Sequence, residues 1–168
     1  MNFSVRKAFP EDAAFCANIH KRSWLYAYTH CLGEEFILQR HKGREAVWKT
    51  MLASPENDNY VAVLNGKIIG IISIGKERDG DMPANTGELC GFYLDPDYIG
   101  KGYGRKAMDW VKQELFSRGY NSVVVWVLDE NHRAKRFYLK NGFVPEGTVK
   151  PSGLKNTMEE RYILRTED

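Results

Sequence analysis

A glycine-rich segment, Gly100-Lys101-Gly102-Tyr103-Gly104, lies between a predicted strand and a predicted helix. Because glycine has no side chain, the backbone N–H groups of such a segment can come close to a phosphate. The helix that follows adds unpaired N–H groups and the positive end of its dipole. Arg105 and Lys106 add positive charge beside them. These features predict a pyrophosphate-binding loop, with a flexible glycine-rich turn as the alternative.

A second segment with chemical groups at regular spacing follows, Asn131-x-x-Ala134-x-x-Phe137-Tyr138-x-x-x-Gly142-Phe143. It places an amide, a small residue and a phenol along one short helix. An amide donates and accepts hydrogen bonds, and a phenol can donate a proton. Taken alone, Tyr138 is better interpreted as a core tyrosine of an amphipathic helix. The pattern of residues around Tyr138 favours a catalytic role for it.

Length and composition exclude several classes of protein. The 168 residues are interpreted as a single domain, residues 1–168, long enough to bury a core without disulfides or metals. The 24 Lys and Arg residues nearly balance the 22 Asp and Glu residues, which argues against a dedicated nucleic-acid-binding protein. The chain shows no signal peptide and no apolar run near the ~18 residues that span a bilayer. Neither a nucleic acid nor a membrane is expected as a partner.

The cysteines and histidines show no metal or disulfide pattern. Cys16, Cys31 and Cys90 are odd in number and widely spaced, without a C-x-x-C pair. Free thiols are typical of a reducing compartment, so a cytoplasmic location is expected. The histidines lack the spacing of a metal site, and no metal is expected.

Hydrophobic periodicity and turn residues divide the chain into strands and helices. Asn65-Gly66 is typical of a two-residue hairpin turn, and Gly119 of a helix end. Strands are predicted at residues 3–6, 59–64, 67–74, 88–94, 122–128, 143–149 and 158–164, with 75–87 as a polar loop. Helices are predicted from residue 10, over 34–52, after the glycine-rich segment and from Asn131 to Asn141.

The order of these elements predicts the fold class. The strand 88–94, the helix after it and the strand 122–128 form one crossover unit, which should be parallel and right-handed. The strand 122–128 is nearly all apolar, as expected for a strand covered on both faces. The remaining strands suit antiparallel pairing. The predicted class is therefore α/β or α+β, with a mixed sheet.

A dinucleotide-binding protein is an alternative. Gly102-x-Gly104-x-x-Ala107 satisfies the relaxed glycine pattern of that class, and Asp129 follows the next strand. Two features count against it. The residues 95–98 separate the glycines from the strand, and the chain shows one clear parallel crossover instead of a doubly wound series.

The two segments together resemble those of the GNAT superfamily, the acyl-CoA-dependent N-acetyltransferases. Residues 100–105 are similar to the acetyl-CoA loop of that family, written R/Q-x-x-G-x-G/A, and the pattern from Asn131 is similar to its following motif. Residues 88–96 look like its fourth strand, and Ser23-Trp24-x-x-Ala27-Tyr28 resembles an early segment. The chain departs from the pattern at Ile99, where the family has Arg or Gln.

The resemblance implies a fold and a co-substrate. The fold is a mixed, mostly antiparallel sheet of about seven strands with helices on both faces and a V-shaped cleft between the fourth and fifth strands. The co-substrate is acetyl-CoA, whose pantetheine arm would lie along Phe92, Tyr93 and Leu94 and bond to Asn131. The pyrophosphate would bind to the loop residues Ile99, Gly100, Lys101, Gly102, Tyr103, Gly104 and Arg105. At Ile99 a side-chain contact to phosphate would be lost.

The resemblance also points to catalytic residues. The acceptor amine arrives as an ammonium with a pKa near ~10 and must lose a proton before it can attack. Glu88 is the candidate general base, with an exposed strand-edge glutamate as the alternative. Tyr138 is the candidate general acid, because its phenol can donate to a leaving thiolate whose conjugate acid has a pKa near ~8.5. A backbone N–H near Tyr93 or Leu94 could polarise the thioester carbonyl.

Trp24 and Tyr28 lie in the early segment that the family uses to wall its acceptor site. Aromatic faces can hold a cation, and plain core aromatics are the alternative interpretation. The expected function is that of an N-acetyltransferase acting on a primary amine, which could be a small molecule or a peptide. A homodimer is possible, since dimers are frequent in this family. A non-catalytic domain that senses acyl-CoA is the alternative.

Overall fold

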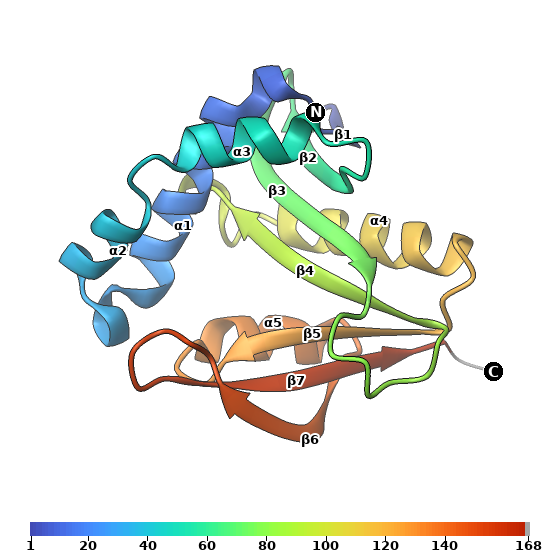
Figure 1. Ribbon diagram of the computed structural model, residues 1–168. Coiled ribbons are helices and arrows are strands. Elements are labelled where there is room, and N and C mark those ends of the chain that lie inside the picture. The colour runs from blue at the N-terminus through green and yellow to red at the C-terminus, as the bar shows by residue number, and fades with distance from the viewer. Residues whose placement is uncertain (167–168) are drawn as a thin grey trace. The chain divides into compact units, whose positions relative to one another are not determined.

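A computed structural model gives the structure of the chain and describes residues 1–166. Figure 1 shows its elements. The strands are β1 (Phe3–Lys7), β2 (Asn59–Leu64), β3 (Lys67–Lys76), β4 (Thr86–Leu94), β5 (Ser122–Leu128), β6 (Val144–Pro151) and β7 (Met158–Arg165). The helices are α1 (Ala13–Leu32), α2 (Glu34–Arg40), α3 (Arg44–Ala53), α4 (Tyr103–Ser117) and α5 (His132–Lys140), with short 3-10 turns η1 (Pro10–Asp12) and η2 (Pro96–Tyr98).

The strands of the described residues form a seven-stranded sheet in the order β1-β2-β3-β4-β5-β7-β6. The β4–β5 ladder is parallel and pairs Thr86, Gly87 and Glu88 with Ser122, Val123 and Val124. The β1–β2, β2–β3, β5–β7 and β6–β7 ladders are antiparallel. This confirms the predicted mixed, mostly antiparallel fold. It does not suit the doubly wound parallel sheet of the dinucleotide-binding alternative. The V-shaped cleft stays a prediction.

The chain divides into two compact units. The first comprises Met1–Ser73 and Gly91–Ala107, and the second comprises Ile74–Cys90 and the chain from Met108 onward. The strands β3 and β4 and the helix α4 contribute residues to both units. The single domain stays a prediction.

In the first unit, apolar residues lie on both faces of β2 and β3, because successive strand residues point to opposite sides. One hydrophobic cluster joins α1 and α3 to Val61 and Ile71; it also contains Ala8, Ala13, Cys16, Ile19, Trp48, Leu52 and Ile68. A second cluster joins Ala62, Leu64 and Ile69 to Tyr103, the first residue of α4. Helical residues therefore cover both faces of the sheet in this unit.

In the second unit, β5 is the buried strand that the apolar run predicted. Val123, Val124, Val125 and Val127 are all buried. On α5, the ring of Tyr138 contacts those of Phe137 and Phe143, each at 5.5 Å between centroids. The α5 helix ends before Gly142, whose φ of +91° places it in the left-handed region that glycine favours.

Several element boundaries differ from the prediction. The helix predicted over 34–52 is two helices. The first, α2, ends at Arg40, and α3 starts anew at Arg44 after Gly43, whose φ of +70° breaks the helix. Strand β3 runs on to Lys76, and β4 begins at Thr86 instead of Glu88. The predicted loop 75–87 is thus shorter, and the Glu77 N–H donates to the Thr86 carbonyl across it.

No helix within the described residues is both long enough and apolar enough to cross a bilayer.

Candidate active site

The predicted phosphate loop forms an open turn directly before α4. Gly100 and Gly102 have φ values of +75° and +86°, which L-residues with side chains rarely adopt. A Cβ added at either glycine would meet no atom within 4 Å, so their outer faces are open. The α4 helix begins at Tyr103, and its first unpaired N–H groups lie next to this turn. The loop therefore has the open backbone and helix start that a phosphate requires.

Lysines gather at this loop. The Nζ atoms of Lys67 and Lys101 lie 5.3 Å and 5.7 Å from the centroid of the Tyr98 ring. Lys106 lies 5.9 Å from the Tyr103 ring. A hydrogen bond to Tyr98 raises the pKa of Lys67. Lys67 was missed in the sequence analysis because it comes from the start of β3, far from the glycine pattern.

Two further residues of the predicted loop, Ile99 and Arg105, are at least partly exposed. Ile99 is partly exposed in extended conformation, and its N–H donates to the Pro96 carbonyl at 3.2 Å. Arg105 is exposed on the first turn of α4. The side-chain contact that the family pattern places at position 99 cannot come from isoleucine, so a cationic contact would have to come from Arg105 or from the lysines at the turn.

The end of β4 is tied to α1. Phe92, Tyr93 and Leu94 are partly buried, and the Leu94 carbonyl accepts a hydrogen bond from Ser23 Oγ at 2.8 Å. One residue later, Asp95 accepts from Arg22 at 3.1 Å. These contacts fix the backbone of the strand along which the pantetheine arm is predicted to lie.

The predicted acceptor-site aromatics belong to a larger ring cluster in the first unit. Trp24 contacts Tyr28 edge to face at 5.3 Å, and His41 at 5.1 Å. His20 lies between Trp24, at 5.6 Å, and Tyr93 of β4, at 4.6 Å. The guanidinium of Arg40 lies 5.9 Å from the Trp24 ring. The cluster therefore connects the predicted acceptor wall to the predicted pantetheine strand.

The two histidines of this cluster both have a lowered pKa. Burial, together with the interactions with His41, Arg44 and Arg40, lowers the pKa of His20 to about 3. Burial also lowers the pKa of His41, although its Nδ1 donates to the Ile37 carbonyl at 3.0 Å. Neither ring nitrogen of His20 has a hydrogen-bond partner among the described residues. A protonated His20 would therefore be costly in this place.

Glu88, the candidate base, is buried with only 2% of its side chain exposed. Both of its carboxylate oxygens accept hydrogen bonds from Arg78. The guanidinium donates to Oε1 at 2.8 Å and to Oε2 at 3.2 Å, and the Arg78 backbone N–H donates to Oε2 at 3.0 Å. Glu88 raises the pKa of the Arg78 guanidinium. Glu88 is thus a buried ion-paired carboxylate, and the reading as an exposed strand-edge glutamate does not describe it.

Asn131 and Tyr138 lie on α5 of the second unit. Asn131 is the N-cap, and its Oδ1 accepts a hydrogen bond from the Ala134 N–H at 3.1 Å. Tyr138 is 7% exposed and lies near the end of the same helix. The predicted spacing of amide and phenol along one helix is therefore present. Their predicted roles stay predictions.

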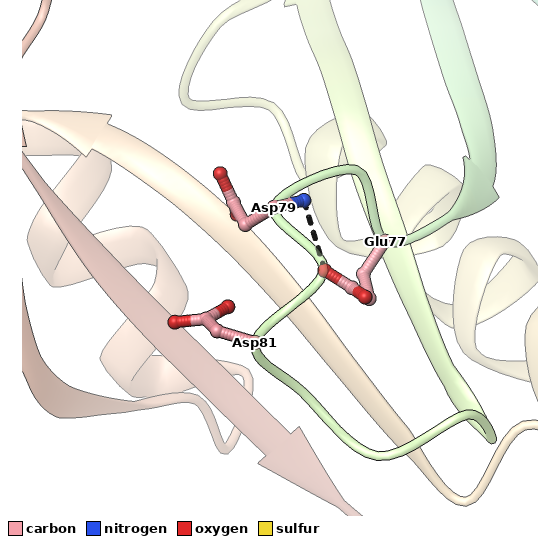
Figure 2. A group of neighbouring side chains, drawn as sticks. All are labelled: Glu77, Asp79 and Asp81. Carbon is pink, nitrogen blue, oxygen red and sulfur yellow. Dashed lines mark hydrogen bonds between the residues drawn. The ribbon is translucent and has the colours of Figure 1, made fainter.

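Three carboxylates in the loop between β3 and β4 lie close together, and Figure 2 shows Glu77, Asp79 and Asp81. Each already has protein partners. Glu77 accepts from the N–H groups of Asp79 and Gly80, both at 2.9 Å. Asp79 pairs with Lys150 at 2.8 Å, and Asp81 with Arg161 at 2.7 Å. The three carboxylates therefore belong to a network of hydrogen bonds and ion pairs that holds this loop in place.

Comparison with known proteins agrees with this fold. The profile of the acetyltransferase (GNAT) family matches residues 14–143. An uncharacterized N-acetyltransferase of Methanocaldococcus jannaschii is 26% identical over 70% of this chain and 52% of its own length. The uncharacterized N-acetyltransferase YuaI of Bacillus subtilis is 27% identical over 76% of this chain and 73% of its own. This chain belongs to the GNAT acetyltransferase family.

Solved structures show the same fold. The PaiA N-acetyltransferase from Thermoplasma acidophilum, crystallised in complex with coenzyme A, superposes with a TM-score of 0.80. The match covers 99% of this chain and 100% of that one, at 22% sequence identity. The chain spans about half the length of the Methanocaldococcus relative.

Proposed function

We propose that this protein is an acetyl-CoA-dependent N-acetyltransferase that acts on a primary amine. The observation that carries the proposal is the open turn of Gly100 and Gly102 directly before α4, in a chain of the GNAT family. An added Cβ at either glycine would fill space that a phosphate can occupy. The residues present therefore fit the co-substrate that the family implies.

The chain offers residues for each part of acetyl-CoA. The turn from Ile99 to Arg105 would bind the pyrophosphate, with Lys67, Lys101 and Lys106 adding positive charge. The backbone of Phe92, Tyr93 and Leu94 would pair with the pantetheine arm, and the amide of Asn131 would bond to it. Trp24 and Tyr28 would line the acceptor side.

Bound acetyl-CoA would supply the acetyl group as a thioester. The Glu88 carboxylate would take a proton from the acceptor ammonium, which frees the nitrogen lone pair for attack. A C–N bond then forms as the C–S bond breaks. The phenol of Tyr138 would give its proton to the departing sulfur. The new amide nitrogen then carries one excess proton, which would pass to the tyrosinate and restore the phenol, and Glu88 would release its own proton to solvent.

A second candidate is a domain that binds acyl-CoA without turnover. The observation that favours it is the Glu88–Arg78 ion pair, because the donors of Arg78 occupy both oxygens of the carboxylate. The same loop and lysines would bind the acyl-CoA in both cases.

An acceptor panel separates the two candidates. The panel holds spermidine, L-lysine, kanamycin, tyramine and an alanine-initiated peptide, and free CoA is followed with a thiol reagent. Release of CoA that requires an amine supports the transferase. Binding of acetyl-CoA by calorimetry without amine-dependent release supports the sensor. Absence of both binding and release contradicts the two candidates together.

A further inference from the structure

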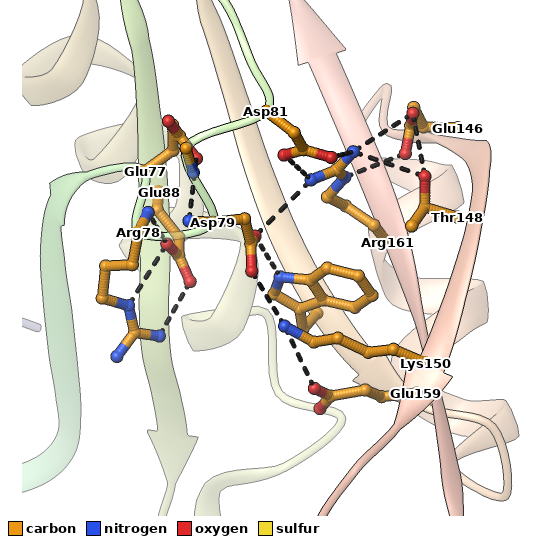
Figure 3. A network of polar contacts seen from close by, with 12 residues as sticks. Glu77, Arg78, Asp79, Asp81, Glu88, Glu146, Thr148, Lys150, Glu159 and Arg161 are labelled. Atoms are coloured by element: carbon orange, nitrogen blue, oxygen red, sulfur yellow. Dashed lines mark hydrogen bonds and ion pairs between the residues drawn. The ribbon is translucent and has the colours of Figure 1, made fainter.

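The pair formed by Arg78 and Glu88 is unequal in its exposure. The Glu88 side chain is 2% exposed, whereas the Arg78 side chain is 67% exposed. The carboxylate therefore lies inside the second unit, and the guanidinium covers it from the solvent side. Figure 3 shows the guanidinium placed over the two carboxylate oxygens. An exposed arginine is the kind of counter-ion that another cation can replace without a change in the fold.

Glu88 needs a positive partner in this position. Burial of an unpaired carboxylate is costly, and the cost falls when a cation and hydrogen-bond donors surround it. Arg78 supplies three donors, of which two belong to the side chain and one is the backbone N–H. If the side chain leaves, the backbone N–H remains as one donor. Any replacement must then bring a positive charge and at least two N–H groups.

The backbone of Arg78 is held in place by its neighbours in the loop. On one side, Glu77 accepts from the N–H groups of Asp79 and Gly80. On the other, Asp79 accepts from the Trp126 indole at 2.8 Å and pairs with Lys150. Because these contacts do not involve the Arg78 side chain, the side chain can move while the loop and the remaining N–H stay fixed.

Arg161 strengthens this loop from β7. Its guanidinium, 2% exposed, contacts Asp81 at 2.7 Å and Glu146 at 2.8 Å (Figure 3). Asp79 is a third partner of Arg161, at 3.5 Å, and a buried arginine with three carboxylate partners is costly to disrupt. The loop is therefore held in place by buried ion pairs at Arg161, whereas the Arg78 side chain at its other end is exposed.

We propose that Arg78 is a displaceable counter-ion, and that the acceptor's primary ammonium takes its place on Glu88 before acyl transfer. This inference rests on the proposed function. The exchange conserves charge, since one cation replaces another beside the same carboxylate. The ammonium brings three N–H groups, enough for both oxygens. One of its protons then passes to Glu88, which leaves the neutral amine that attacks.

The proposal narrows the acceptor class to amines that arrive as cations. An alkylammonium can replace Arg78, whereas an arylamine, neutral near pH 7, brings no charge to offset the loss of the guanidinium. A quaternary ammonium has charge but no N–H donors and also fails. Tyramine should therefore be acetylated at least about tenfold faster than aniline at equal concentration, and choline should not compete with tyramine.

The first test replaces the counter-ion. Arg78→Met should lower KM for tyramine by about tenfold and leave KM for acetyl-CoA unchanged, because the amine no longer competes with a guanidinium. Arg78→Lys keeps the positive charge but loses the planar guanidinium that bonds to both oxygens. It should lower KM for tyramine by less, about threefold. The matched control is Arg118→Met, which removes an arginine from a surface pair with Glu114. An unchanged or raised KM for tyramine in a folded Arg78→Met protein would overturn the proposal.

The second test needs no turnover. In a ¹⁵N spectrum of the CoA-bound wild-type protein, the Arg78 Nε–H signal is identified by its loss in Arg78→Lys. Tyramine should move this signal, and choline should not. An unmoved signal at tyramine concentrations that saturate turnover would overturn the proposal. If no primary amine in the panel is acetylated, the proposed function fails instead, and the two failures remain distinct.

Discussion

Asn131 Oδ1 accepts a hydrogen bond from the Ala134 N–H at 3.1 Å, so the amide predicted to bind pantetheine is also the N-cap of α5. Its oxygen is used by the helix, and its NH₂ group is the part that can donate to a ligand. The two roles therefore belong to different atoms of one side chain and can be separated by mutation.

Asn131→Asp keeps a capping oxygen and removes the NH₂ donor. Its thermal stability should equal that of the wild type, while acetyl-CoA affinity, measured by calorimetry, should fall by about fivefold or more. Asn131→Ala should lose the same affinity and also about 1 kcal/mol of stability. If Asn131→Asp binds acetyl-CoA as well as the wild type does, the residue acts as a cap alone.

Tyr138→Phe removes a hydroxyl and keeps the ring. If that hydroxyl protonates the leaving thiolate, kcat should fall by roughly 10²-fold or more, the range of general acids, with little change in acetyl-CoA affinity. The matched control is Tyr162→Phe, at another buried tyrosine of the second unit. Steady-state kinetics and calorimetry on both variants decide the matter. A near-normal kcat in Tyr138→Phe would return Tyr138 to the role of a core tyrosine.

Gly102→Asp should weaken acetyl-CoA binding by at least about tenfold, because a carboxylate would face the pyrophosphate at an open position. Gly153→Asp is a matched control, in the loop between β6 and β7. Gly153 has a φ of +78° against +86° for Gly102, and a Cβ at either would meet no atom within 4 Å. Both variants should therefore share the same backbone strain, measured as a loss of thermal stability. Equal acetyl-CoA affinity in the two variants would show that the loop does not bind the pyrophosphate.

His20 should make stability depend on pH. Its pKa in the folded protein is about 3, below the ordinary value of 6.5, so the unfolded chain takes up a proton first as the pH falls. The contribution of His20 to the free energy of unfolding is complete above about pH 6.5 and is lost progressively as the pH falls toward 3. Between about pH 7.5 and pH 5 the loss should be about 2 kcal/mol, on the usual conversion of pKa differences to free energy.

His20→Phe keeps an aromatic ring between Trp24 and Tyr93 and removes the titrating group. Urea unfolding should show less loss of stability between about pH 7.5 and pH 5 in this variant than in the wild type. The control is His30→Phe, at an exposed histidine of the same helix, which should keep the wild-type slope. Equal slopes in His20→Phe and the wild type would mean that the pKa of His20 is not lowered in the folded protein.

The sequence predicted the features that depend on local patterns. The open turn at Gly100 and Gly102 follows from glycine spacing, and the buried strand β5 follows from its run of valines. The break at Gly43 could have been predicted from the His41-Lys42-Gly43 segment, since glycine commonly ends a helix. The helical periodicity on both sides of Gly43 instead favoured one continuous helix.

Other features depend on contacts that no local pattern contains. Arg78 lies in a polar stretch and gains its role from Glu88, 10 residues away in sequence but opposite it in the fold. Arg161 looks like an ordinary strand arginine until Asp81 and Glu146 surround it. The lowered pKa of His20 likewise follows from its burial among other rings, which sequence spacing does not reveal.

The edge strand β6 bears on how copies of this protein meet in solution. It ends the strand order, its ladder with β7 shifts between Pro145 and Val149, and it carries a second proline at Pro151. Prolines, lysines and bulges on an edge strand discourage another strand from adding to it. Concentrated protein should therefore resist edge-to-edge aggregation through β6. A dimer, if one forms, has to use side-chain packing instead of an extended sheet across this edge.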